Sequence, residues 1–353
     1  MMTMENICTY RRVFHLSSLL ALLSMLGSCK KLIEIPVNPP TSVIREQIFK
    51  DSATTLSAVA GVYSLTPGGA GLPYQDGTFT ISTSLSGHEI AYTGSTEEFS
   101  QFFTYNVTPV NAVLNGIWQA HYTEIYQVND ILENIKDNGY LSTSFIRQIT
   151  GEMKFVRAFC YFNLVNLFGG VPLVTTTDYQ TNARLPRAQS EAVYAQILAD
   201  LGDAVQLLPP AYPSPGHLRP NLYTAIALQA KVNLFLGKWQ QAYNEADSVI
   251  RSGDFSLVTN LNDVFLDNSK EAIWQVPVLN TFQGSMEASY FLPNSTTVAP
   301  NFVITDSLLN QFEPGDRRLS AWTGVNVIGG QNVYYPAKYK DKQQTTPRQI
   351  TCF

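Results

Sequence analysis

The residues of this chain that are best suited to chemistry are aromatic side chains on expected loops. Tyr74 and Asp76, Tyr92, Tyr290 and Trp322 all lie outside the expected helical stripes. Sugar rings bind proteins by stacking their flat C–H faces on Tyr and Trp rings, while Asp, Asn and Arg side chains hydrogen-bond the hydroxyls. These residues are therefore the candidate ligand contacts, with a protein interface as the alternative, because exposed aromatic residues are also common there.

Cys29 offers a second kind of chemistry, because the residues before it resemble a bacterial lipobox. Arg11-Arg12 and the apolar stretch 13–26 precede Gly27-Ser28-Cys29, and an apolar stretch of this length suits a signal peptide but is too short to span a bilayer. In such lipoproteins the cysteine receives acyl chains and becomes the first mature residue, and three chains anchor stably. We predict a lipoprotein signal peptide over residues 1–28, lipidation of Cys29 and a proline-bearing tether over residues 29–45. The alternative is an ordinary signal peptide that happens to end in cysteine.

The other residue types do not indicate catalysis or metal binding. The four histidines show no metal-ligand spacing and no HExxH or triad-like motif. His88 is expected to be a solvated loop residue, with a role in a binding loop as the alternative. Glu97 and Glu98 are expected to be adjacent solvated acids and not the carboxylate pair of a glycosidase. The net charge of −5, without any Lys/Arg run longer than two, offers no basic surface. We therefore predict no enzyme activity, no catalytic residue, no metal, no cofactor and no nucleic-acid partner.

Helices are the elements expected to position these residues. The ranges with helical apolar spacing are 118–135, about 145–168, 190–208, 219–237 and 239–251. Neighbouring helices are expected to pair, with Ser190 as an N-cap and with helix 239–251 packed on a later segment. Asn129, on the stripe of the first helix, is expected to be a buried hydrogen-bonding group.

Two segments around these helices are expected to be rich in loops. After a short helix over residues 51–63, residues 64–116 show no sustained helical period, and irregular segments of this length are usually functional. Beyond residue 255 the pattern predicts a strand over residues 271–278, a short helix over residues 307–312 and a charged turn at residues 316–318.

Residues 151–174 predict a nearly uninterrupted apolar helix, which ends at Gly169-Gly170 and Pro172. A helix that is apolar on nearly every face must be buried among other helices. Arg157 then needs a partner, for which Glu152, Glu124 and Asp130 are the candidates. Cys160, in the same helix, is expected to be a small buried apolar residue.

Several of these segments, in this order, resemble the SusD/RagB family of surface lipoproteins from Bacteroidetes-type outer membranes. The segments are the lipobox at Cys29, WQAHYTEIYQVNDILENI, GEMKFVRAFCYFNLVNLFGGVPLV, Arg187 with Tyr194-x2-Ile197-x2-Asp200-Leu201, Arg219 with KVNLFLGKWQQAYNEADSVI, Glu271-Ala-Ile-Trp, and Asp316-Arg317. The segment GEMKFVRAFCYFNLVNLFGGVPLV is specific to the family. Each of the other segments is weak evidence alone, but together in this order they are strong evidence.

The resemblance implies a mainly α fold of tetratricopeptide-like helix pairs with long loop-rich excursions and a few short strands. It also implies an outer-membrane protein that is lipid-anchored at the cell surface. Such a protein binds oligosaccharides, or peptides in RagB-like members, and delivers them to a SusC-like TonB-dependent transporter without catalysing a reaction. A protein-binding scaffold and a glycan-cleaving enzyme are the competing functions.

The same resemblance divides the chain after the tether. Residues 46–255 match the N-terminal region with its helix-pair repeats, and residues 256–340 match the start of a loop-rich second subdomain. Residues 341–353 show no periodicity and depart from the family, which we interpret as a premature stop or frameshift near residue 343. Helix 239–251 would then lack a cover, and we expect an exposed apolar patch on it.

Overall fold

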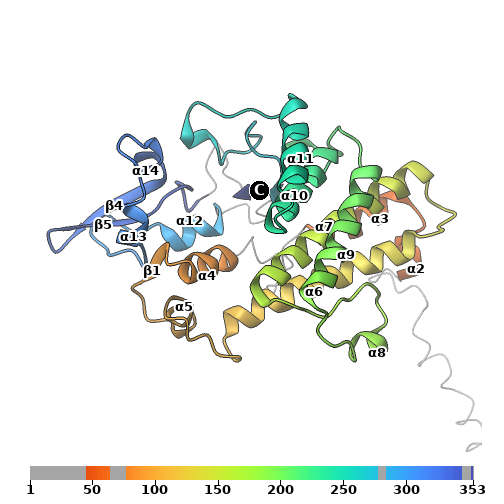
Figure 1. Ribbon diagram of the computed structural model, residues 1–353, viewed down its shortest axis with the longest axis horizontal. Helices are drawn as coiled ribbons and strands as arrows, with labels where there is room; N and C mark the ends of the chain where they lie inside the picture. The colour runs from red at the N-terminus through yellow and green to blue at the C-terminus, as the bar shows by residue number, and fades with distance from the viewer. Residues whose placement is uncertain (1–44, 64–76, 277–283, 344–350, 353) are drawn as a thin grey trace, which may run out of the picture.

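The computed structural model describes residues 45–63, 77–276, 284–343 and 351–352 (Figure 1). The expected signal peptide, Cys29, Tyr74 and Asp76 lie outside the described residues. The fold is mainly helical with short strands, as predicted.

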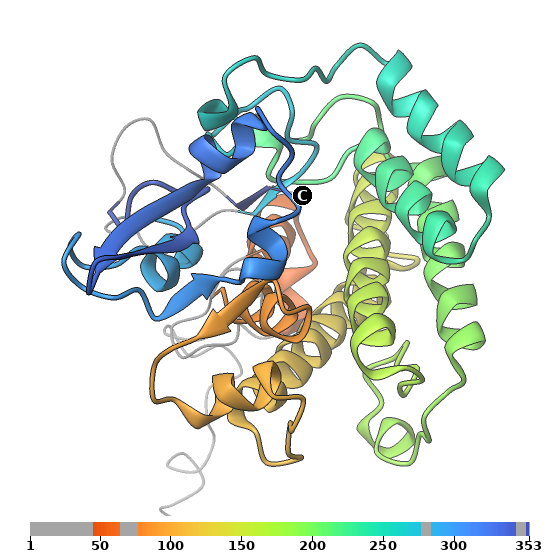
Figure 2. The same cartoon turned by 60° about the vertical axis from the view of Figure 1, so that its left-hand side comes forward.

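Consecutive helix pairs form the larger of two lobes. Its main helices are α6 (Ala112–Ile135), α7 (Thr143–Phe168), α9 (Ser190–Leu207), α10 (Leu222–Phe235) and α11 (Trp239–Arg251). Each packs on the next along the chain, and they stand side by side in Figure 2. The tetratricopeptide-like pairing is thus confirmed. The short helices α2 (Arg45–Ile48), α3 (Ser52–Val62), α8 (Tyr179–Asn182) and η1 (Pro215–His217) accompany these pairs.

Among the described elements, α11 packs mainly on α10, which precedes it. The later partner expected for helix 239–251 stays a prediction. Gly237 adopts a left-handed backbone, with φ 69°, and this permits a tight reversal between the two helices. The exposed apolar residues expected on this helix are present: Trp239 is 67% exposed and Tyr243 64%.

The smaller lobe combines segments from both halves of the chain (Figure 1). Its helices are α4 (Thr78–Ser86), α5 (Glu97–Phe103), α12 (Met286–Phe291), α13 (Asp306–Leu309) and α14 (Arg317–Trp322), with η2 (Leu261–Asp263) beside α14. Its strands are β1 (Ile90–Tyr92), β3 (Phe302–Ile304), β4 (Thr323–Ile328) and β5 (Gln331–Pro336).

Antiparallel strand pairs connect the parts of this lobe. β1 pairs with β3, placing Ile90 opposite Ile304, so residues about 200 positions apart share one small sheet. β4 and β5 form a hairpin that turns at Gly329-Gly330, both with positive φ, as tight hairpin turns require. Elsewhere, β2 (Gln275–Val276) pairs with β6 (Thr351–Cys352).

Some predicted elements were wrong or displaced. Residues 77–111 are not irregular, because α4 and α5 form there; helices this short do not show a sustained period. Ser190 is the first residue of α9 and not its N-cap, which is Gln189 without a side-chain hydrogen bond. Of the strand expected over residues 271–278, only residues 271–276 are described, and of these Gln275 and Val276 form β2. The helix expected over residues 307–312 is the shorter α13, Asp306–Leu309.

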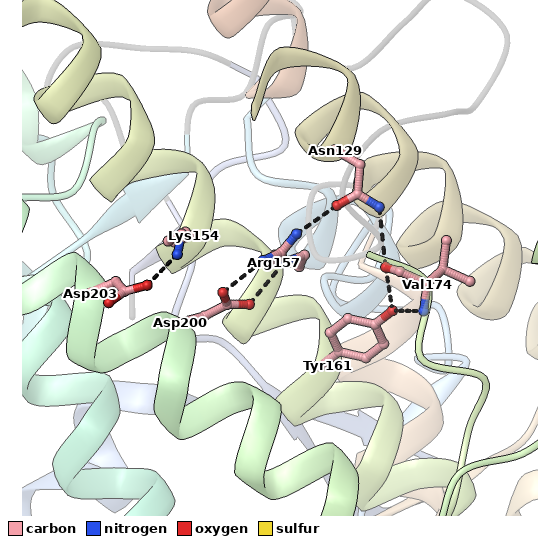
Figure 3. A network of polar contacts seen from close by, with 7 residues as sticks. All are labelled: Asn129, Lys154, Arg157, Tyr161, Val174, Asp200 and Asp203. Atoms are coloured by element: carbon pink, nitrogen blue, oxygen red, sulfur yellow. Dashed lines mark hydrogen bonds and ion pairs between the residues drawn. The ribbon is translucent and has the colours of Figure 1, made fainter. Parts of the chain in front are cut away.

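Arg157 is held by a buried network that joins three helices (Figure 3). Its Nε and Nη2 lie 2.8 and 2.7 Å from the Asp200 carboxylate of α9, and Nη1 donates to Asn129 Oδ1 of α6 at 2.8 Å. Asn129 Nδ2 and the Tyr161 hydroxyl both donate to the Val174 carbonyl oxygen. Asn129 is therefore the buried hydrogen-bonding group that was predicted, and Cys160 is buried as expected.

The partner predicted for Arg157 was wrong, because Asp200 lies 43 residues away and none of the three candidates bonds it. Glu152 is used elsewhere: Arg219 donates to both of its carboxylate oxygens at 2.8 and 2.6 Å, and Tyr63 donates to one at 3.3 Å. The three candidates lie on α6 and α7, whereas the actual partner, Asp200, lies on α9.

Candidate ligand-binding cavity

A cavity of about 380 Å³ lies in the smaller lobe, between α4, α12, α13 and α14. Its lining includes the aromatic residues Phe79, Phe265 and Trp322 and the polar residues Thr80, Glu287 and Lys338. They come from five separate segments of the chain, so only the folded lobe brings them together. The wall combines aromatic rings with a few polar groups, as small-molecule sites usually do.

Trp322, the last residue of α14, provides the largest ring of the cavity. Asp316 begins this helix by accepting a hydrogen bond from the Arg318 backbone N–H at 2.8 Å. The indole Nε1 of Trp322 donates to the Leu261 carbonyl oxygen at 3.0 Å, and the ring meets Phe265 edge-on with centroids 5.5 Å apart. The half-buried indole is thus held on one side by η2 and presents its remaining surface to the cavity.

Lys338 places a positive charge against these rings. Its Nζ lies 5.4 Å from the Trp322 centroid and 5.9 Å from the Phe265 centroid, within the range of cation–π attraction. Desolvation lowers the pKa of Lys338, and the nearby Glu89 carboxylate partly opposes this shift. Lys338 as a whole is exposed, so its charge is only partly removed from solvent.

Carboxylates and a hydroxyl complete the polar groups of the cavity. Glu287 is 3% exposed, and Thr80 Oγ1 donates to its Oε1 at 3.5 Å. Glu89 lies at the exposed rim. Aromatic faces beside carboxylate, hydroxyl and ammonium groups can stack on a sugar ring and hydrogen-bond its hydroxyls.

Tyr92 and Tyr290 come together next to this cavity and not inside it. Both rings pack around Phe99 and Phe302, with centroid distances from 5.0 to 6.3 Å. The Tyr92 hydroxyl accepts a hydrogen bond from the Thr96 backbone N–H at 3.1 Å. Both tyrosines are half-buried, and their contact with a ligand stays a prediction.

Sequence reasoning missed Phe265, Glu287 and Lys338. The expectation that the candidate aromatics lie on loops was wrong, because Trp322 ends α14, Tyr92 lies in β1 and Tyr290 lies in α12. Trp322 nevertheless lines the cavity, but no spacing in the sequence links residue 265 or 338 to it. Phe265 follows η2, and Lys338 lies just after β5. Their convergence is produced only by the packing of α14 on η2.

The described part of the chain holds neither a cluster of metal-ligating side chains nor a membrane-spanning helix. Within residues 45–63, 77–276 and 284–343, no three His, Cys, Asp or Glu side chains gather in a way that would hold a metal ion. No helix in the described part of the chain is long and apolar enough to cross a membrane.

Helix pairs beside an aromatic-lined cavity define a helical-repeat protein of the tetratricopeptide-like class. The SusD-like family described as "Starch-binding associating with outer membrane" matches residues 50–234, just over half of the chain. The chain belongs to this SusD-like family.

Individual relatives agree with this assignment. SusD-like protein P25 of Formosa agariphila is 26% identical over 271 residues, which cover 74% of this chain and 51% of that protein. A SusD-like protein of Bacteroides ovatus is 25% identical over 194 residues, covering 50% of this chain and 35% of its own length. The chain thus spans about half the length of the curated relatives it matches, or less.

Solved structures share the fold. A SusD superfamily protein from Bacteroides thetaiotaomicron superposes with a TM-score of 0.71 at 22% identity, over 85% of this chain and 72% of that one. A structure titled "Laminarin binding SusD-like protein" gives a TM-score of 0.70 at 22% identity, over 86% of this chain and 77% of that one.

Proposed function

We propose that this protein is an outer-membrane lipoprotein that binds oligosaccharides at the cell surface and delivers them to a SusC-like TonB-dependent transporter. The observation that carries the proposal is the cavity in which Trp322 and Phe265 stand beside Thr80, Glu287 and Lys338. Two names support the ligand class: the family description refers to starch, and one structural neighbour is titled as a laminarin binder.

The proposed role is binding without chemical conversion of the glycan. In the cavity, the carboxylate of Glu287 is paired with a hydroxyl group and the ammonium group of Lys338 lies on aromatic faces. These contacts suit a site that holds sugars and releases them unchanged to a transporter. Release of reducing ends from a bound glycan would contradict this role.

Affinity electrophoresis tests the ligand class directly. The purified chain is run in native gels with and without laminarin or soluble starch, with a non-binding protein as the mobility standard. We expect retardation in at least one polysaccharide. Unchanged mobility in both gels would contradict glycan binding.

A protein- or peptide-binding scaffold is the second candidate, as in RagB-like members. The exposed aromatic residues Phe235, Trp239 and Tyr243 on α10 and α11 favour it, because such residues are enriched at protein interfaces. Retention of a β-barrel membrane protein or of peptides, together with no retardation by either polysaccharide, would support the scaffold over the glycan-binding function.

A further inference from the structure

Two helices of the smaller lobe end at an aromatic residue in the position where glycine is usual. His88 follows α4 with φ 53° and Tyr105 follows α5 with φ 54°. In both cases the backbone makes the same pair of closing hydrogen bonds. His88 N donates to Leu85 O and Glu89 N to Ser84 O, while Tyr105 N donates to Phe102 O and Asn106 N to Gln101 O. This is the Schellman motif, whose left-handed residue is most often glycine.

The left-handed backbone conformation costs a residue with a side chain roughly 1–2 kcal/mol relative to the right-handed conformation. Burial of the side chain does not offset this, because Tyr105 is 67% exposed and His88 is also exposed. Unfavourable backbone conformations that are maintained on the surface concentrate at functional sites.

The two rings face each other. Their centroids are 4.7 Å apart and their planes differ by 24°, so they are stacked. The His88 ring also lies 4.7 Å from Phe103, and its Nε2 is 2.8 Å from the Phe103 carbonyl oxygen. Since a carbonyl oxygen only accepts, Nε2 carries the proton, and Nδ1 faces no hydrogen-bonding partner among the described residues. The face of Tyr105 that meets His88 is covered, so the exposed aromatic platform is the opposite face of Tyr105, with His88 Nδ1 as the adjoining polar nitrogen.

A groove of about 630 Å³ begins beside the platform. Its lining includes Gly87, next to His88, and Val107, two residues after Tyr105, but neither His88 nor Tyr105 itself. The helix α4 separates this groove from the Trp322 cavity, because Thr83 contributes to the walls of both. A chain of several sugars therefore has room on either side of the C-terminal end of α4.

We propose that His88 and Tyr105 form a second stacking site, for one pyranose ring of a longer oligosaccharide. This inference rests on the proposed glycan-binding function. A pyranose presents the flat C–H face that an exposed aromatic ring attracts, and its hydroxyls can donate to His88 Nδ1.

Tyr105→Gly is the most informative variant, because glycine suits the left-handed backbone while removing the ring. We expect a melting temperature close to that of the wild type and affinity for laminarin or soluble starch about two- to tenfold weaker, the range expected for one aromatic contact. Tyr105→Phe keeps the ring and should retain the affinity. Asp137→Gly is the matched control, since Asp137 is also exposed and left-handed, with φ 55°, but follows α6.

The outcomes separate this inference from the function on which it rests. If the wild type binds and Tyr105→Gly binds equally well, the second site is refuted while glycan binding stands. If Tyr105→Gly and Asp137→Gly weaken binding equally, the effect comes from the backbone and the second site is again refuted. If the wild type binds neither polysaccharide, both proposals fail.

Discussion

Arg157 holds together three helices of the larger lobe, since its guanidinium group bonds Asp200 of α9 and Asn129 of α6 from its place on α7 (Figure 3). Both charged side chains are nearly inaccessible, at 8% and 2% exposure. Removing one member of such a pair leaves an uncompensated buried charge.

Asp200→Ala should therefore lower the free energy of unfolding by about 3–5 kcal/mol. The control is Asp203→Ala, because Asp203 pairs with Lys154 on the surface and its side chain is 48% exposed. That variant should cost about 0–1 kcal/mol. Urea denaturation of the two variants beside the wild type measures the difference, and equal losses would contradict the assigned role.

Glu124 is a second buried group in this lobe, and no charged partner faces it among the residues that the structure describes. Its side chain is 4% exposed, and Oε1 lacks a hydrogen-bond partner in the described part of the chain. Desolvation raises the pKa of Glu124 well above its usual value of 4.5. The folded protein therefore favours the protonated acid, and the neighbouring groups Tyr63 and Cys160 also favour their neutral forms.

The sign of the resulting pH dependence follows from that shift. In the unfolded chain Glu124 ionises near pH 4.5, whereas in the folded chain its burial opposes ionisation. The contribution of Glu124 to the free energy of unfolding is therefore complete below pH 4.5 and is lost as the pH rises. Glu124→Gln should then lose less stability than the wild type between pH 4.5 and pH 8. Urea denaturation at several pH values checks this. Parallel pH profiles for the two proteins would show that Glu124 does not contribute.

Gly170, just after the end of α7, packs against Ala188, just before the start of α9. A side chain on Gly170 would collide with the carbonyl oxygen of Ala188. The exposed Gly116 within α6 has open space around it.

Gly170→Ala should thus destabilise the protein by about 1–3 kcal/mol, as forced overpacking usually does. Gly116→Ala should stabilise it by about 0.5–1 kcal/mol, because alanine favours helix. Thermal unfolding of both variants gives the comparison. A stabilising effect of Gly170→Ala would contradict the close packing of Gly170 against Ala188.

The long helices could be predicted from the sequence, because a sustained apolar period and clear stops such as Gly237 and Gly253 define each one locally. The smaller lobe could not. Its helices are too short to show a period, and β1 pairs with β3 across about 200 residues. The cavity shares this difficulty: a rule based on residue type selects Trp322, but only the folded lobe places Lys338 against its ring.

At the scale of the whole molecule, the helix pairs form one lobe and the candidate sites lie in the other. The described N-terminal helices α2 and α3 pack in the helical lobe (Figure 1). In the proposed arrangement, Cys29 anchors the chain to the membrane through residues 29–45.

Cys29→Ala should move the protein from the outer-membrane fraction to the soluble fraction, because the acyl chains supply the proposed anchor. Cell fractionation with immunoblotting measures the distribution, and Cys160→Ala is the control because Cys160 is buried in α7. Retention of Cys29→Ala in the membrane would show that another feature anchors the chain.

The central claim, that the Trp322 cavity binds glycan, is tested most directly by titration calorimetry of Trp322→Ala with whichever of laminarin or soluble starch retards the wild type. The control is Trp239→Ala, an exposed tryptophan on α11, and thermal unfolding shows whether both variants are folded. We expect Trp322→Ala to weaken binding at least about fivefold, because it removes the largest stacking surface, and Trp239→Ala to leave it unchanged. Unaltered affinity in a folded Trp322→Ala would contradict the account.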